Sequence, residues 1–258
     1  SSRTAAPPAP QLPPDALFAD AFVAYPRGRV FALGGRRSKP VVDDQASEWE
    51  REHGYMIDGA IVWQTDAEGA GFKAVQLPGT SPRDRILRGQ LLRAGSEDGT
   101  LLWGMHEAWK DRRETTTPYL ARFSGGEWRR VAIDVPVVEL SQGKDGTIWA
   151  IRGKDALSDR GPTSLERLTF DASGAAKLEP VDLRFERAWL DLGDDAKTML
   201  GTCVNVWPRS VAAVGAGDVW LTAECRPEVG DGASIVLHTQ AQGRLVEVPE
   251  LTREPPPS

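Results

Sequence analysis

Three stretches of the sequence repeat one pattern: residues 95–105 (GSEDGTLLWGM), 143–151 (GKDGTIWAI) and 215–223 (GAGDVWLTA). Each places a turn rich in Gly and Asp before a short apolar segment that contains one tryptophan. A degenerate fourth copy is residues 26–33 (PRGRVFAL), in which Phe31 takes the place of the tryptophan. One aromatic position that recurs at uneven steps indicates a repeated structural unit with insertions of different length.

Each copy is preceded by one predicted strand and followed by two more, which are joined by a turn that contains glycine. The predicted first strands cover residues 17–24, 86–93, 137–142 and 204–214. The later pairs cover residues 60–65 and 72–77, 119–123 and 128–133, 165–170 and 177–183, and 235–239 and 245–251. Many of these segments alternate apolar and polar residues, as half-buried strands do.

Four units of four strands, with one aromatic motif in each unit, predict an all-β fold, a β-propeller of about four four-stranded blades. The alternatives are part of a larger propeller, or five blades if residues 184–199 hold further paired strands. A β-sandwich or another barrel would not require a tryptophan at one recurring position. The predicted propeller covers residues 17–251, between a Pro/Ala-rich tether (1–16) and a Pro-rich tail (252–258).

The repeats resemble those of bacterial β-propeller proteins. The Asp-Gly-Thr turns at residues 98–103 and 145–149 are similar to repeats of sensor ectodomains. Residues 211–221 (VAAVGAGDVWL) are similar to repeats of myxobacterial surface proteins. Residues 96–103 also distantly resemble the Asp-box of sialidases, with the glycine one place early. These resemblances imply a fold and not a function.

The two cysteines, Cys203 and Cys225, flank a predicted hairpin turn at residues 215–218. Pairing of the two strands would bring the thiols close together, so we predict a disulfide; separate buried thiols are the alternative. In the chain-entropy model a bridge that closes a loop of about 20 residues is worth roughly 3 kcal/mol. Such a bridge is typical of proteins that fold in an oxidising compartment.

Several features predict an exported bacterial protein. A Ser-Ser start before a Pro-rich spacer is typical of a lipoprotein just after its lipidated cysteine, although an arbitrary sequence boundary would look the same. No apolar run approaches the ~20 residues that a membrane-spanning helix needs. We therefore expect the outer membrane, the periplasm or the cell surface, with a lipid anchor upstream of Ser1 as one option.

The composition argues against several functions. The formal net charge is -6, and Arg and Lys are scattered singly, which does not suit a nucleic-acid partner. Two cysteines without a nearby histidine make a metal site improbable, and no cofactor motif occurs. The histidines are far apart in the sequence, and acidic pairs at residues 43–44 and 194–195 are typical of solvated loops. The sequence therefore predicts no catalytic residue, cofactor or metal.

The links between the second and third strands are predicted to be long and to lie on one face: residues 36–59, 108–118, 154–164 and 226–233. Loops on one side of a rigid scaffold are where binding normally resides. The candidate partner face, including the adjoining strand ends, consists of Arg36, Arg37, Trp49, His106, Glu107, Trp109, Lys110, Asp111, Arg152, Lys154, Asp155, Glu224 and Arg226. The charged members could instead only solvate the loops, whereas loop tryptophans are uncommon without a role.

The leading functional prediction is a non-enzymatic binding or scaffold module that engages a protein partner through this face. The alternative is a carbohydrate-binding or carbohydrate-active propeller, in which Trp49 or Trp109 would stack on sugar rings. A structural subunit of a larger assembly is a third reading.

Overall fold

The computed structural model describes residues 11–26, 28–38, 51–52, 54–66, 69–110, 113–154, 161–181, 184–185, 203–227, 232–240 and 244–247. Apart from two helical residues, 51 and 52, the regular elements among these residues are strands. The prediction of an all-β fold is thus confirmed. The chain divides into two compact units, Ser1–Arg130 and Val131–Ser258, which are described one at a time.

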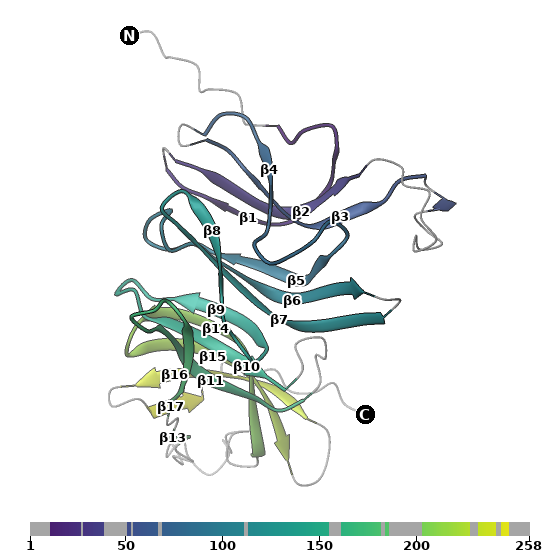
Figure 1. Ribbon diagram of the computed structural model, residues 1–258. Coiled ribbons are helices and arrows are strands. Elements are labelled where there is room, and N and C mark those ends of the chain that lie inside the picture. The colour runs from purple at the N-terminus through teal and green to yellow at the C-terminus, as the bar shows by residue number, and fades with distance from the viewer. Residues whose placement is uncertain are drawn as a thin grey trace, which may run out of the picture. The chain divides into compact units, whose positions relative to one another are not determined.

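The first unit contains two consecutive meanders of four strands (Figure 1). The first meander consists of β1 (Ala16–Ala24), β2 (Val30–Arg37), β3 (Ile57–Gln64) and β4 (Lys73–Gln76). The second meander consists of β5 (Arg85–Leu92), β6 (Leu101–Lys110), β7 (Arg113–Ser124) and β8 (Glu127–Val131). A single parallel contact joins the two meanders, because Gly59 on β3 pairs with Arg85 on β5.

The second unit repeats this layout. The third meander consists of β9 (Val137–Gln142), β10 (Ile148–Gly153), β11 (Thr163–Phe170) and β12 (Ala176–Pro180). The fourth consists of β14 (Cys203–Gly215), β15 (Asp218–Pro227), β16 (Ala233–Gln240) and β17 (Arg244–Glu247), and the two-residue β13 (Arg184–Phe185) pairs with β17 in parallel. The predicted arrangement of four units of four strands is therefore present.

An aromatic cluster fills the core of the first unit, between its two meanders. The ring of Phe31 lies 4.8 Å from that of Phe123 and 5.3 Å from that of Trp128, measured between ring centroids. Tyr25 adds an edge contact to Phe31, and its hydroxyl lies 2.7 Å from the hydroxyl of Thr100. Burying one such ring contributes roughly 1.5–3 kcal/mol, so this cluster is the main attachment between the two meanders.

The core of the second unit is aliphatic around one tryptophan, and a disulfide closes one side of it. Trp149 packs with Leu221, Ile235 and other apolar side chains of the fourth meander. Cys203 and Cys225 are bonded, with their Cα atoms 5.3 Å apart across 22 residues of sequence. The predicted disulfide is confirmed, and it supports an oxidising compartment for this protein.

The four motif aromatics, Phe31, Trp103, Trp149 and Trp220, all lie on the second strand of their meander. Phe31 and Trp149 belong to the apolar clusters between paired meanders. Trp103 follows Leu102, which faces the core of the first unit, so the alternation of side chains directs Trp103 to the opposite face of the sheet. The repeated sequence motif thus corresponds to the second strand of each meander.

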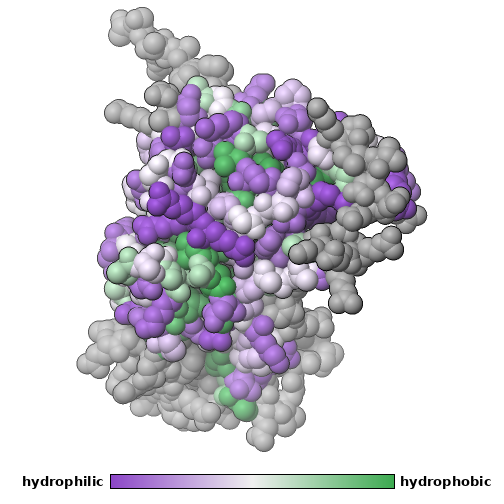
Figure 2. Space-filling view, viewed as in Figure 1, coloured by the Kyte–Doolittle hydropathy of each residue, from purple (hydrophilic) through white to green (hydrophobic). Residues whose placement is uncertain are grey.

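On the coloured part of the face seen in Figure 2, hydrophilic residues are interspersed with smaller hydrophobic patches. The large apolar side chains that the structure exposes lie on two strands: Phe18 and Phe22 on β1, and Val204 and Val214 on β14. Among the described residues, we find no helix long and apolar enough to cross a membrane.

Candidate functional site

An open cavity lies between β1 and β5, the first strands of the two meanders of the first unit. Its volume is about 550 Å³, within the range of ordinary small-molecule sites. It is lined by Asp20, Ala21, Arg88, Gly89, Gln90 and Leu91. Asp20, Arg88 and Gln90 are exposed, so a ligand could reach all three side chains.

Both strands that line the cavity carry an irregularity at the charged residue. In the β1–β2 pairing, Ala19 lies opposite Gly34 and Ala21 opposite Leu33, which leaves Asp20 as an extra residue. The β5–β6 pairing likewise shifts between Leu87 and Gln90, in the segment that contains Arg88. Bulges of this kind redirect side chains and are over-represented beside active sites.

The backbone of Arg88 is strained, and glycines make room for the bulge around it. Arg88 has a φ of 50°, in the left-handed region that non-glycine residues rarely adopt. A Cβ atom on Gly89 would lie 2.2 Å from Cδ2 of Leu33, and one on Gly104 would lie 2.9 Å from the backbone oxygen of Leu87. The bulge therefore depends on two residues without side chains, and strain of this type gathers at ligand-binding positions.

The lining offers a balanced set of hydrogen-bonding groups. The carboxylate of Asp20 accepts hydrogen bonds, the guanidinium of Arg88 donates them, and the amide of Gln90 does both. Phe18 and Phe22, two residues on either side of Asp20, are 39% and 59% exposed and add apolar surface to the same strand. The cavity thus suits a small ligand that carries several hydroxyl groups and no net charge.

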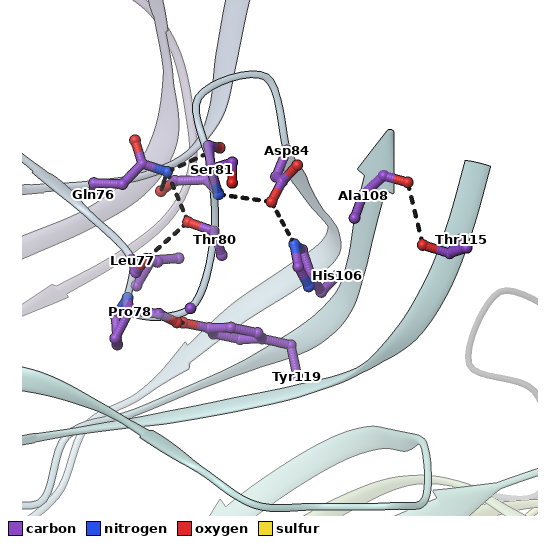
Figure 3. Close-up of polar contacts among 12 residues, drawn as sticks. Gln76, Leu77, Pro78, Thr80, Ser81, Asp84, His106, Ala108, Thr115 and Tyr119 are labelled. Atoms are coloured by element: carbon purple, nitrogen blue, oxygen red, sulfur yellow. Dashed lines mark hydrogen bonds and ion pairs between the residues drawn. The ribbon is translucent and has the colours of Figure 1, made fainter. Parts of the chain in front are cut away.

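A second polar feature of the first unit is the buried pair of His106 and Asp84, shown in Figure 3. Nε2 of His106 lies 2.8 Å from Oδ2 of Asp84, and the same oxygen accepts the backbone N–H of Ser81. The ring of His106 also contacts that of Tyr119, whose hydroxyl donates to the carbonyl of Pro78. This network holds the link between β4 and β5, which leads directly into the cavity strand.

Burial raises the pKa of the Tyr119 hydroxyl well above its ordinary value, which the nearby positive charge of Arg130 only partly offsets. Tyr119 is therefore a neutral donor to Pro78 throughout the physiological pH range. Through this hydrogen bond, Tyr119 stabilises the link between β4 and β5.

The predicted partner-face residues of the first unit lie near the carboxyl ends of second strands. Arg36 contacts Asp58 through its Nε at 3.1 Å, and the guanidinium of Arg37 lies 4.7 Å from the ring centroid of Tyr55. His106 is buried with its ring against that of Tyr119, so it is not part of an exposed face. Trp49 and Asp111 lie outside the described residues, as do the side chains of Trp109 and Lys110.

Residues 108–110 and 113–118, expected to belong to a long link, instead continue strands β6 and β7. Trp109 pairs with Glu114 and Lys110 with Arg113, so strand pairing persists to the tip. The run of threonines at residues 115–117 explains the difference, because β-branched residues favour the extended strand conformation.

Glu107, on the same hairpin, has a raised pKa. Burial is the largest cause, and a hydrogen bond and the negative charge of Glu114 act in the same direction, while the charge of Arg85 lowers it. Arg85 lies opposite Glu107 in the β5–β6 pairing, at the start of the strand that lines the cavity. Arg85 precedes Arg88 by three residues of β5, which is about 10 Å at about 3.3 Å per residue. Glu107 is therefore about 10 Å from Arg88 along the strand direction.

In the second unit the predicted face residues form ion pairs. Arg152 lies 3.5 Å from the buried carboxylate of Glu166, and Glu224 contacts Arg226. Lys154 is exposed just after β10, and Asp155 lies outside the described residues. The structure therefore assembles these residues in separate clusters, one in each meander.

Sequence reasoning missed Asp20 and Arg88. The one available signal was Gly89, because a glycine inside a predicted strand often marks a bulge. The pairing shift at Asp20 has no such signal in the sequence. Ala, Asp and Phe alternate around this position as they would in a regular strand.

No family model matches the chain, and neither does any curated protein. Among solved structures, it is similar to a mannose phosphorylase from Leishmania mexicana, with 13% identity and a TM-score of 0.38 over 84% of this chain and 61% of that one. It is also similar to a GH43 endo-arabinanase from Bacillus licheniformis, with 10% identity and a TM-score of 0.35 over 92% of this chain and 76% of that one. The chain spans less than two thirds of the length of the mannose phosphorylase.

These neighbours correct two sequence-based predictions. Both are named as enzymes that act on carbohydrates, whereas the sequence predicted a non-enzymatic module for a protein partner. The predictions that the chain is a scaffold and that it is not an enzyme are therefore wrong. The likeness assigns no role to any residue of this chain.

Proposed function

We propose that this protein is carbohydrate-active and that it binds a saccharide in the cavity between β1 and β5. The observation that carries the proposal is the placement of Asp20 and Arg88 at two separate bulges that face one cavity. The β9–β10 and β14–β15 pairings are shifted as well, so the support specific to this site is that two bulges bring opposite charges to one cavity.

The chemistry of the lining supports this ligand class. A carboxylate and a guanidinium can each bridge two neighbouring hydroxyl groups, and the amide of Gln90 can bind a third. Because the charges of Asp20 and Arg88 balance, the site favours a neutral sugar over an anion or a cation.

The test is a calorimetric binding screen with neutral mono-, di- and trisaccharides, followed by a hydrolysis and phosphorolysis assay on the sugars that bind. Arg88→Gly removes the guanidinium and relaxes the backbone, because glycine readily adopts a φ of 50°. We expect this variant and Asp20→Asn to bind at least tenfold more weakly, or about 1.4 kcal/mol, without a loss of melting temperature.

The matched control is Lys73→Ala, which removes an exposed positive charge from β4 of the same unit. It should bind as the wild type does. A wild-type protein that binds no saccharide in the screen would refute the proposed function.

We also infer that the four meanders are the four blades of a β-propeller and that the protein is exported. The first inference is supported by the common position of the motif aromatics, and the second by the bond between Cys203 and Cys225. Rotational averaging by electron microscopy of a fusion-enlarged particle would count the blades. Cell fractionation with thiol labelling of the native protein would show its compartment and whether a lipid anchor precedes Ser1.

A further inference from the structure

A compact arginine cluster lies on the β14–β15 hairpin, far along the chain from the saccharide cavity. The guanidinium carbons of Arg209 and Arg226 lie 5.6 Å and 5.4 Å from the ring centroid of Trp207. Both arginines contact Glu224, Arg209 at one carboxylate oxygen and Arg226 at the other. Trp207 lies opposite Glu224 in the strand pairing, so the four side chains share one face of the hairpin.

The cluster carries an excess of positive charge. Among the residues that the structure describes, two guanidinium groups share the single carboxylate of Glu224, which leaves one positive charge on this face of the hairpin. Arg209 uses its Nε and one terminal nitrogen for Glu224, and Arg226 uses one terminal nitrogen. Each guanidinium therefore retains N–H donors, and the side chain of Arg226 is 44% exposed.

Three features hold these donors in place. The ring of Trp207 supports both guanidinium groups through cation–π contacts. Arg209 is the extra residue of a bulge, because Pro208 lies opposite Ala223 and Ser210 opposite Thr222. The disulfide of Cys225, which lies between Glu224 and Arg226 in the sequence, fixes the end of the hairpin.

We propose that Arg209 and Arg226 form a binding site for an oxyanion on the outer face of the β14–β15 hairpin. Two arginines with fixed planes and unused donors match the paired oxygens of a carboxylate, and sulfate and phosphate groups share that chemistry. Glu224 orients both arginines and also competes with the ligand for them. This site is independent of the neutral-sugar cavity of the first unit.

The experiment is a nuclear magnetic resonance titration of the full chain with glucuronate, inorganic sulfate and inorganic phosphate, with glucose as the uncharged counterpart of glucuronate. The indole N–H signal of Trp207, assigned by its loss in Trp207→Phe, reports binding next to the two arginines. Low ionic strength is required, because the interaction of exposed charges is screened by salt. We expect the three anions to shift this signal with millimolar affinity and glucose to leave it unchanged.

Opposite effects from two variants make the test specific. Arg226→Gln should weaken anion binding at least tenfold, whereas Glu224→Gln, which removes the competing carboxylate and leaves a neutral partner, should strengthen it. Lys177→Gln is the matched control, since Lys177 is an exposed cation of the same unit paired with Glu179, and it should bind as the wild type does. Comparison of glucuronate with the inorganic anions then shows which oxyanion fits best.

The proposal is overturned if no anion shifts the Trp207 signal, or if Lys177→Gln and Arg226→Gln weaken binding equally. It is also overturned if Glu224→Gln, with an unchanged melting temperature, binds anions no better than the wild type. None of these results depends on whether the cavity of the first unit binds sugar.

Discussion

The first strands of paired meanders meet in different ways in the two units. In the second unit, side chains of β9 bond directly to the backbone of β14: Glu139 accepts the N–H of Val211 at 3.3 Å, and Ser141 accepts the N–H of Ala213 at 2.9 Å. In the first unit, β1 and β5 instead border the cavity that contains Asp20 and Arg88. One meander layout can therefore be closed by two acceptor side chains or opened by two bulges.

This comparison separates positions that maintain the fold from positions that are free to bind. The acceptors on β9 satisfy backbone donors that an unpaired strand edge would otherwise expose. The bulges of β1 and β5 give up regular pairing at the same level of the meander and place charged groups there. The pairings of the second unit are also shifted, between Ile151 and Arg152 and between Pro208 and Ser210, so the cavity is what distinguishes the first unit.

The largest expected effect concerns what the two units have in common. Trp149→Ala should lower the free energy of unfolding of the second unit by about 3–5 kcal/mol, because it leaves a cavity in the core. Phe31→Ala should have an effect of similar size in the first unit. Urea unfolding followed by circular dichroism measures both. A loss below about 1 kcal/mol for either would show that the motif aromatics are not equivalent.

The next effect should appear in the second unit alone. Replacing Cys203 and Cys225 together with alanine should cost about 3 kcal/mol, since the open chain gains entropy on unfolding. Hydrogen exchange resolved by segment should show faster exchange in β14 and β15, with the first unit unchanged. Equally faster hydrogen exchange in both units would show that the disulfide does not stabilise the second unit alone.

A third variant tests the bulge that opens the cavity. Gly104→Ala should cost about 1–3 kcal/mol, because the added Cβ would lie 2.9 Å from the backbone oxygen of Leu87 and 3.0 Å from Cα of Gly89. Gly95→Ala is the control, since a Cβ at that position meets nothing within 4 Å. Thermal melting distinguishes the two variants, and equal melting temperatures would show that the bulge adjusts freely.

The smallest effect concerns the closed pair of strands. Burial raises the pKa of Glu139, and the N–H of Val211 only partly offsets it, so ionised Glu139 is less favourable in the folded chain than in the unfolded one. The stability it contributes is present below its ordinary pKa of 4.5 and is lost as the pH rises above that value. Glu139→Gln keeps an oxygen that can accept the N–H of Val211 and removes the charge.

This variant should therefore be more stable than the wild type at neutral pH, by a few tenths of a kcal/mol to about 1 kcal/mol. The gain should disappear below pH 4.5. Melting temperatures across the pH range measure it, and a gain that is largest in acid would reverse the assignment.

Much of the fold could be predicted because its signals are local. The turns before Trp149 and Trp220, the alternation of the strands and the spacing of the cysteines each depend on neighbouring residues. The cavity could not be predicted in this way, because a shift in pairing depends on the partner strand. Asp20 fits a regular strand by sequence and becomes an extra residue only opposite Gly34 and Leu33.

The expectation that His106 lies on an exposed face was wrong for a related reason. His106 resembled a strand-end surface residue, but its partner Asp84 comes from a different strand connection 22 residues away. The pairing of Arg209 with Glu224 was equally invisible, since a bulge brings Arg209 to that position. The register of two strands decides which polar side chains lie opposite each other. The alternation of apolar residues predicts only the face of the sheet on which a side chain lies.

The contact between Gly59 and the carbonyl of Asp84 has a consequence for dividing this protein into parts. Although the sequence repeats by meander, a fragment that ends after β4 would remove the acceptor of the Gly59 N–H and leave the edge of β3 open. The two compact units divide at the end of β8 instead. The sequence thus repeats by one meander, whereas the compact unit of the structure is a pair of meanders.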